Sequence, residues 1–311
     1  MATQKIRNIW LDLFRFLLIF MVINIHFNEQ SFFLPIFRLA VPMFFMISGY
    51  FSYSKDYNAQ MNKNIKSIKA SLSYIVFGYS FCFVVGLILL LFNYDMTKYE
   101  LFPYSYHLWF LISFFVVWCV HFLICKYNLQ KIYWYIVPIL IIIALALNIC
   151  IEVFELNLPL ILNRNAFFVG LPMFGIGYLL HRGGVVAGST KTKVLTLLLA
   201  VVFLFLSLLE AQIVVLEYYI CSVFSSVCFL LFFASLRVQT NKYIEWYYKY
   251  IGSKVVFCIY IIHLFIGNII ALSGIDTWCL SLLTLLAAFV VYEIVYLLLL
   301  ILKKKNSIKT E

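Results

Sequence analysis

The sequence is poor in charged residues, which make up only 12% of its 311 positions. A soluble globular domain usually contains about 25% charged and about 45–50% apolar residues, whereas 65% of this chain is apolar. With a mean hydropathy of +1.01, a soluble fold would expose much apolar surface, and disorder requires low hydrophobicity. The 12 glycines and 6 prolines are too few for a collagen-like chain. These shortages leave a helical protein that crosses a membrane several times.

Paired cysteines are also missing. None of the eight cysteines forms a Cys-x-x-Cys pair, and all lie in or beside apolar runs. We therefore expect small buried or lipid-facing side chains, without disulfides and without a bound metal. The net charge of +10 would suggest nucleic acid for a soluble protein, but here the basic residues lie between apolar runs. We expect a lipid bilayer as the partner and no nucleic acid.

Ten apolar runs have about the length that a membrane-spanning helix needs, and they are too continuous for barrel strands. The sixth run is the shortest and contains Pro172, so we expect it to be kinked or tilted. The predicted fold is an all-α, polytopic integral membrane protein made of a single domain, residues 1–311. Its predicted spans are residues 8–27, 31–53, 71–92, 107–125, 132–151, 166–181, 194–210, 213–236, 255–273 and 278–302.

The basic residues indicate an orientation for these spans. With the N-terminus on the cytoplasmic side, nearly all of the 23 Lys and Arg residues fall in cytoplasmic segments. Only Lys98 and Arg164 lie on the other side, and Arg15 and Arg38 lie within spans. The positive-inside rule therefore predicts that both termini are cytoplasmic.

Ionisable residues inside a membrane are costly, and each is a functional candidate. The predicted spans contain a short list of them, and two more lie at outer helix ends. The residues within spans are Asp12, Arg15, His26, Arg38, His263 and Glu293, and those at the ends are His107 and Arg164.

The first span carries the most informative pattern. Asp12 and Arg15 are three residues apart and thus neighbours on one helix face. His26 follows Arg15 by eleven residues, which returns to within about 20° of the same direction about 16 Å along the axis. Such a stripe could line a channel across the bilayer. The alternative is an Asp12–Arg15 ion pair that holds helices together, with His26 reaching the outer interface.

The remaining intramembrane residues are less informative. Arg38 lies near the outer end of the second span, and Ser48 precedes a glycine, a pair that permits close packing or the approach of a ligand. We place His263 in the inner half of its span and Glu293 in the outer half of the last one. Both are interpreted as polar ties between helices and not as catalytic groups.

Several sequence blocks, in order along nearly the whole chain, resemble those of the membrane acyltransferase-3 family. The segment Leu11–Arg15 followed by His26 is similar to the family's Arg-x10-His signature. The other blocks are residues 42–51, which end in Ser-Gly-Tyr-Phe, residues 107–111, Arg164 with residues 171–178, and residues 259–263.

The resemblance implies a ten-helix enzyme that takes an acyl group, by default acetyl, from cytoplasmic acyl-CoA. It transfers this group to a hydroxyl of an envelope glycan or a lipid-linked sugar at the outer face. His26 would act as the general base, or less favourably as an acylated intermediate, while Arg15 would orient the donor or stabilise negative charge and Asp12 would fix Arg15. No cofactor would be bound, because acyl-CoA is a co-substrate. The residues implied for acceptor binding are Arg38, Ser48, His107 and Arg164; all except Ser48 could equally anchor the interface.

One position departs from the family. Where many members have an Arg-x-x-Arg pair before the third span, this chain has Lys66 and Lys69. Lysine binds phosphate as a point charge without the two-pronged geometry of arginine. These lysines are predicted to attract the donor, although they could instead serve only as topology signals.

Two other functions fit the same features. Polar residues in a helix bundle can line the path of a transporter or flippase for a lipid-linked glycan or polysaccharide. The chain could also be a non-catalytic partner of glycan-assembly proteins. In each case we expect a multi-pass protein of a bacterial inner membrane, without the additional extracytoplasmic domain that larger family members carry.

Overall fold

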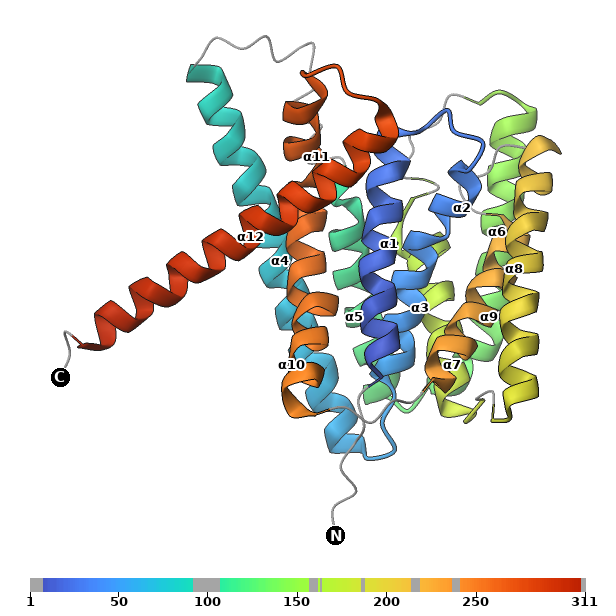
Figure 1. Cartoon of the computed structure of the whole chain (residues 1–311). Helices are drawn as coiled ribbons and strands as arrows, with labels where there is room; N and C mark the ends of the chain where they lie inside the picture. The colour runs from blue at the N-terminus through green and yellow to red at the C-terminus, as the bar shows by residue number, and fades with distance from the viewer. Residues whose placement is uncertain are drawn as a thin grey trace. The chain divides into compact units, whose positions relative to one another are not determined.

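The computed structural model describes residues 8–91, 107–156, 162, 164–185, 188–213, 219–236 and 241–308. All regular secondary structure in these residues is helical (Figure 1). Within them, eight helical segments are long and apolar enough to cross a membrane, and two shorter apolar helices accompany them. This is the all-α, polytopic membrane architecture that the composition predicts.

The chain forms two compact units. Unit 1 combines both ends of the sequence, Met1–Leu34 and Gln239–Glu311, and unit 2 contains Pro35–Val238. Each unit is built from helices that pack mainly on members of the same unit, so each is described by itself.

Unit 1 is built around the first helix and one long helical column. The column consists of α10, the π-helical turn η5 and α11, which follow one another without a break. Figure 1 draws α10 and α11 as this orange column, with the red helix α12 crossing α11 obliquely. The helices of unit 1 are α1 (Ile9–Phe27), α10 (Lys242–Tyr250), η5 (Ile251–Val255), α11 (Val256–Ala271) and α12 (Thr277–Ile308).

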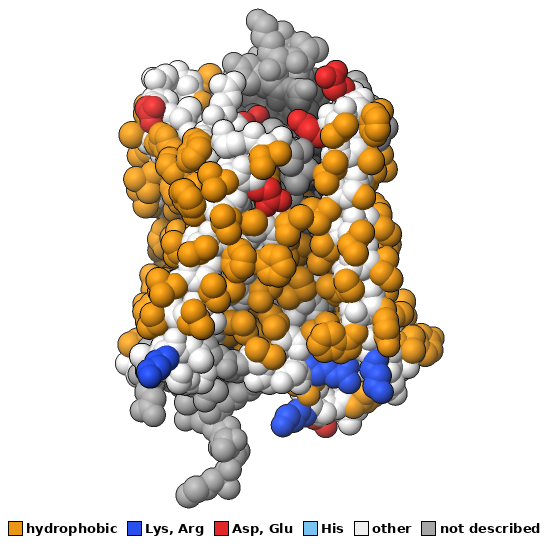
Figure 2. All heavy atoms as spheres, turned by 90° about the vertical axis from the view of Figure 1, so that its right-hand side faces the viewer, with side chains coloured by type: hydrophobic (Ala, Val, Ile, Leu, Met, Phe, Trp, Pro, Cys, Tyr) orange, Lys and Arg blue, Asp and Glu red, His pale blue; other side chains and the backbone are white. Residues whose placement is uncertain are grey.

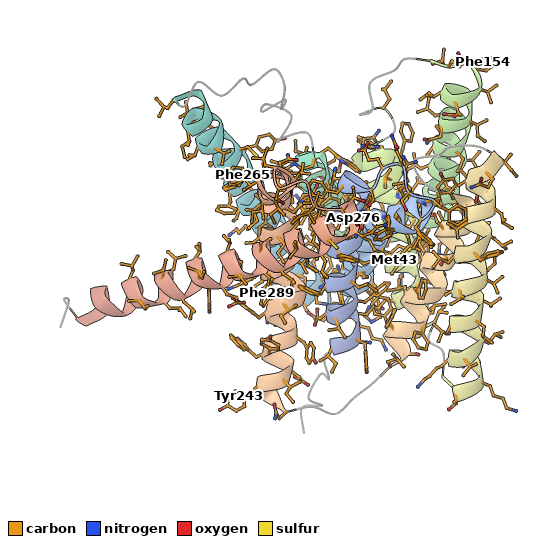
Figure 3. The ribbon with its side chains drawn as sticks, turned by 45° about the horizontal axis from the view of Figure 1, so that its top comes forward. Met43, Phe154, Tyr243, Phe265, Asp276 and Phe289 are labelled. Carbon is orange, nitrogen blue, oxygen red and sulfur yellow. The ribbon has the colours of Figure 1, made fainter. Side chains whose placement is uncertain are left out.

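The second half of α12 has little protein around it. From Val290 to Leu302 its large apolar side chains are 43–62% exposed. Figure 3 shows side chains projecting from several sides of α12 beyond Phe289. A helix that exposes so many large apolar side chains is stable only in a nonpolar environment. This half of α12 therefore suits contact with lipid.

Unit 2 holds the middle of the chain. Its elements are α2 (Leu34–Arg38), α3 (Ala40–Ser52), α4 (Tyr57–Leu91), α5 (Trp109–Lys126), η2 (Gln130–Ile132), α6 (Tyr133–Val153), η4 (Ala166–Gly170), α7 (Leu171–Arg182), α8 (Thr190–Ile213) and α9 (Ile220–Ser235). The most buried of them is α3, which packs against α7.

Two glycines allow α3 and α7 to touch through their backbones. A Cβ atom on Gly49 of α3 would collide with the backbone of Phe174, and one on Gly177 of α7 would collide with the backbone of Met46. Small residues at a helix crossing are the usual way for membrane helices to pack closely. The Ser48–Gly49 pair therefore serves close packing, which is one of the two interpretations that the sequence allows.

The surface of unit 2 is divided into zones. Figure 2 turns the α8 side toward the viewer and shows a broad hydrophobic band, with Lys and Arg gathered at one end and most of the Asp and Glu side chains toward the other. A surface that faces lipid needs such an apolar band between polar ends.

Every predicted span falls on a helix, but several boundaries differ. Helix α4 begins at Tyr57 instead of residue 71, and the ninth helical segment begins at Lys242 instead of residue 255. The prediction followed apolar runs, whereas a helix continues through polar residues that face water. The second span is divided at Leu39 into α2 and α3. In the sixth span, the π-helical turn η4 precedes Pro172, which lies in the first turn of α7.

Candidate active site

Helix α1 presents its charged residues to the helical column of unit 1. Asp12 is fully buried, and its Oδ1 atom lies 3.3 Å from Nη1 of Arg15. The same Nη1 atom lies 3.5 Å from the carbonyl oxygen of Gly252 in η5. The ion pair indicated by the three-residue spacing thus forms, and it both joins α1 to η5 and fixes the guanidinium.

Gly252 makes this approach possible. A Cβ atom at this position would lie 2.7 Å from Cα, Cβ and the carbonyl oxygen of Asp12. Any larger residue would therefore push η5 away from α1 and move its carbonyl away from Arg15.

At the other end of α1, His26 faces a second histidine. The ring centroids of His26 and His263 are 5.3 Å apart, with the planes inclined by 43°. His263 is fully buried in α11, and its Nδ1 lies 2.7 Å from the carbonyl oxygen of Tyr260. Arg15 and His26 therefore both face the column, as the eleven-residue spacing predicts.

The depths assigned to His263 and Glu293 from the sequence are wrong. The predicted position of His263 is the inner half of its span and that of His26 the outer half of the first, yet the two rings are 5.3 Å apart, and the helix begins at Lys242, so residue 263 lies past its middle. Glu293 was placed in the outer half, yet its Oε2 accepts a hydrogen bond of 3.4 Å from the Tyr250 hydroxyl. Tyr250 is two residues from Gly252, so Glu293 lies at the Arg15 end of unit 1.

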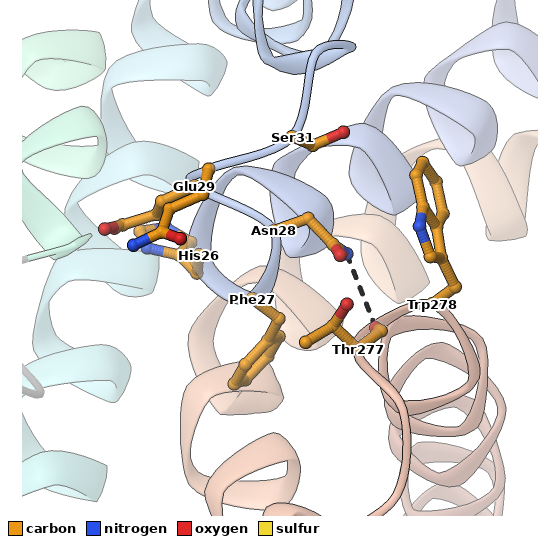
Figure 4. A pocket seen from close by; sticks show the side chains of 8 residues that line it. His26, Phe27, Asn28, Glu29, Ser31, Thr277 and Trp278 are labelled. Atoms are coloured by element: carbon orange, nitrogen blue, oxygen red, sulfur yellow. Dashed lines mark hydrogen bonds between the residues drawn. The ribbon is translucent and has the colours of Figure 1, made fainter.

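A cavity of about 510 Å³ opens beside His26. Figure 4 shows its walls, which come from the end of α1, the following loop and the start of α12. The volume lies in the range of small-molecule sites, about 300–1,000 Å³. The lining residues, which include no Lys or Arg, are His26, Phe27, Asn28, Glu29, Gln30, Ser31, Thr277 and Trp278.

A buried amide network fixes the floor of this pocket. The Asn28 side-chain nitrogen donates to Oδ1 of Asn24 at 2.8 Å, to Oγ of Ser281 at 3.0 Å and to the carbonyl of Thr277 at 3.4 Å. The network joins the end of α1 to the first turns of α12. The sequence analysis overlooked Asn24 and Asn28, although polar amides in an apolar helix are a signal of such a tie.

The residues expected to bind the acceptor all belong to unit 2. Ser48 is buried in α3, where its hydroxyl donates to the carbonyl of Phe44 at 2.7 Å. Arg38 ends α2 and is half-buried, and Arg164 is half-buried just before η4. His107 is buried in the turn that precedes α5. The positions of these four residues are therefore described within unit 2.

The two lysines expected to attract the donor lie on α4. Lys66 and Lys69 are exposed and three residues apart, so they share one face of the helix. Nearby Lys63 has a different role, because its Nζ donates to the carbonyl of Tyr53 at 2.8 Å, just past the end of α3. Such a contact stabilises a helix C-terminus.

His121, which is fully buried in unit 2, is not among the residues predicted from the sequence. Its Nδ1 lies 2.9 Å from the Tyr133 hydroxyl and its Nε2 lies 3.3 Å from the Gln60 side-chain nitrogen. Cys125, one turn along α5, places its sulfur 3.5 Å from Nε2. Three helices thus enclose this histidine with polar partners.

His181 was also missed. It lies near the end of α7, where its ring stacks on Tyr50 with centroids 4.4 Å apart and its Nδ1 bonds to the Tyr50 carbonyl. This contact adds a polar link to the close crossing of α3 and α7.

Comparison with known proteins identifies one family. A model of the acyltransferase domain, acyltransferase-3, matches residues 8–302. No curated protein matches the chain, and no solved structure does. The matched range includes elements of both units and every candidate residue described above.

Proposed function

Because the chain belongs to the acyltransferase-3 family, we propose that this membrane acyltransferase moves an acyl group, by default acetyl, from cytoplasmic acyl-CoA to a hydroxyl of an envelope glycan or lipid-linked sugar. The observation that carries the proposal is the face of α1 that Arg15 and His26 share. Arg15 is paired with the buried carboxylate of Asp12, and His26 lines a pocket.

His26 is the general base of this proposal. Imidazole can exchange protons near neutral pH, and His26 lies where a hydroxyl group in the pocket can reach it. It takes the hydroxyl proton while the oxygen attacks the thioester carbonyl carbon. The carbon–sulfur bond then breaks, and the thiolate of CoA takes the proton back from His26.

Arg15 has the role of orienting the donor. It lies about 16 Å along the axis from His26, which is too far to contact a thioester carbonyl that reacts beside the imidazole. The long arm of acyl-CoA can cover this distance, so Arg15 contacts the donor along its arm. Asp12 and the Gly252 carbonyl hold the guanidinium ready for this contact.

The pocket beside His26 suits a neutral sugar as acceptor. Glu29, Gln30, Ser31 and Thr277 offer carboxylate, amide and hydroxyl groups to sugar hydroxyls, and Trp278 offers a flat apolar face. With one carboxylate and no Lys or Arg in its lining, the pocket disfavours anionic acceptors. Acceptor binding there places a hydroxyl beside the base.

The test is a His26→Ala variant supplied with acetyl-CoA that carries a labelled acetyl group. Membranes of a host that makes the wild-type protein are expected to transfer label to envelope glycans, detected by mass spectrometry. The variant is expected to insert normally and to lose transfer by about 10²–10⁴-fold. The neighbouring Ile25→Ala variant, also on α1, serves as the matched control and is expected to keep the wild-type rate.

Three outcomes contradict the proposal. Full transfer by His26→Ala removes His26 from the chemistry. Export of unmodified glycan without consumption of acyl-CoA indicates the transporter instead. Loss of a glycan-assembly complex with acylation unchanged indicates the non-catalytic partner.

A further inference from the structure

We propose that His263 is the positioning residue of the transfer reaction: its Nε2 accepts a hydrogen bond from the imidazolium that forms on His26. The inference rests on the proposed function. It adds a residue of α11 that acts through His26 of α1. His263 had been interpreted from the sequence as a polar tie, but its place in the structure points to this different role.

The orientation of the His263 ring is set within its own helix. Its Nδ1 lies 2.7 Å from the Tyr260 carbonyl oxygen, and a carbonyl oxygen can only accept, so Nδ1 carries the proton of this bond. The neutral ring is thereby left with Nε2 as its acceptor. The bond lies inside α11 and fixes the ring without joining α11 to another helix.

Two glycines hold α1 and the column in register. Phe27 occupies the space that a Cβ on Gly267 would need, just as Asp12 occupies that space at Gly252. Gly252 and Gly267 are separated by the same number of residues as Asp12 and Phe27, so the two helices run parallel with matched spacing.

This register determines which side chains face each other. Gly267 lies four residues after His263 on the same face of α11, and His26 directly precedes Phe27. Seating Phe27 at Gly267 therefore brings His26 to within one helical turn of the level of His263, in agreement with the 5.3 Å between their centroids. The pairing is fixed by close packing at both ends of α1, of the Asp12 backbone on Gly252 and of the Phe27 ring on Gly267.

An acceptor is needed at this place during the reaction. After His26 has taken the hydroxyl proton, both of its nitrogens carry hydrogen, and the ring is charged until the leaving thiolate takes the proton back. A hydrogen bond from a charged ring is stronger than one from a neutral ring, so an acceptor at this place favours the imidazolium form of His26. A neutral Nε2 on His263 satisfies the second N–H and holds the ring in orientation, as the orienting member of a catalytic triad does.

Two amide substitutions separate this role from a purely structural one. In His263→Asn the side-chain nitrogen replaces Nδ1 and keeps the bond to Tyr260, but nothing reaches the position of Nε2. In His263→Gln the longer amide places its oxygen near Nε2. The experiment measures kcat and the KM for labelled acetyl-CoA in membranes, normalised to folded protein from size-exclusion chromatography.

We expect His263→Asn to lower kcat by about 10–100-fold with an unchanged KM, and His263→Gln to retain kcat within about fivefold of wild type. The reverse order overturns the inference, because it would show that only the bond to Tyr260 matters. Equal kcat values in the two variants, whether high or low, also overturn it. If the wild-type protein transfers no acetyl group, the proposed function itself fails.

Discussion

Each unit contains a fully buried histidine, and the two differ in what surrounds them. In unit 2, both ring nitrogens of His121 meet protein partners, the Tyr133 hydroxyl and the Gln60 amide, within a packed core. In unit 1, His263 bonds through Nδ1 to its own helix and faces His26, which lines a cavity. In the first arrangement both ring nitrogens have protein groups as partners. In the second, the pair of histidines lies beside a pocket.

The contrast shows that an ionisable residue in a membrane helix is a functional candidate by default only until its partners are known. A histidine whose hydrogen bonds end on protein groups stabilises the helix contacts that supply them. A histidine beside a cavity can exchange protons with a ligand. We therefore assign His121 to structure, and we keep the His26–His263 pair as the one with a chemical role in the proposed reaction.

The largest expected effect comes from comparing His121→Leu with His26→Leu. His121→Leu leaves the buried Tyr133 hydroxyl without this partner, at about 1–3 kcal/mol, whereas the Gln60 amide still donates to the Ser52 carbonyl and to Oδ1 of Asn64. We expect a lower thermal midpoint of the detergent-solubilised protein, with kcat per folded molecule near wild type. His26→Leu is expected to do the opposite and reduce kcat by about 10²–10⁴-fold. A loss of kcat in His121→Leu at full stability would break the contrast.

The next largest effect is expected at glycines in two helix contacts, that of α3 with α7 and that of α1 with α11. Gly177→Ala sets a methyl group against the backbone of Met46, which cannot move aside, so we expect a loss of about 1–3 kcal/mol in stability. Gly267→Ala sets it against the end of the Phe27 ring, which can rotate away. The fold should survive there, but once the Phe27 ring no longer sits on Gly267 the level of His26 against His263 is not fixed, and kcat is expected to fall about tenfold. Thermal unfolding and acetyl transfer measure the two effects, and an unchanged kcat in Gly267→Ala would contradict the register argument.

The sequence predicts what depends on one helix alone. The Asp12–Arg15 pair and the shared face of Arg15 and His26 follow from the helical repeat, and the structure contains both. The ten apolar runs likewise locate the helices. What the runs miss is where a helix continues through polar residues, which is why the level of His263 was wrong.

Contacts between helices could not be predicted in the same way. His121 stands alone in the apolar stretch 109–126, a signal in itself, but nothing in that stretch indicates that Gln60 and Tyr133 supply its partners. The pocket depends on how the loop after α1 meets the start of α12. Both features arise from tertiary packing, for which one sequence contains no local pattern.

A moderate effect is expected at Trp278, which lines the pocket beside His26. If a sugar packs on its face, Trp278→Ala should raise the KM for the acceptor about three- to tenfold, corresponding to about 0.5–1.5 kcal/mol, with kcat unchanged. Trp278→Phe keeps a ring and is expected to retain most of the affinity. Initial rates at increasing amounts of isolated envelope glycan measure this KM. An equal KM in all three proteins would place the acceptor elsewhere.

The smallest effect concerns the exposed lysines of unit 2, a unit whose buried histidine we assign to structure. If Lys66 and Lys69 attract the polyanionic donor, replacing both by Gln should raise the KM for acetyl-CoA about two- to fivefold at low salt, because exposed charges contribute at most about 1 kcal/mol. The difference should vanish near 1 M salt, where the Debye length is about 3 Å. Replacement of the exposed Lys126 and Lys191 by Gln is the matched control. Equal KM values for the two double variants at low salt would leave Lys66 and Lys69 with a role in topology alone, and unit 2 without a contribution to donor capture from this face of α4.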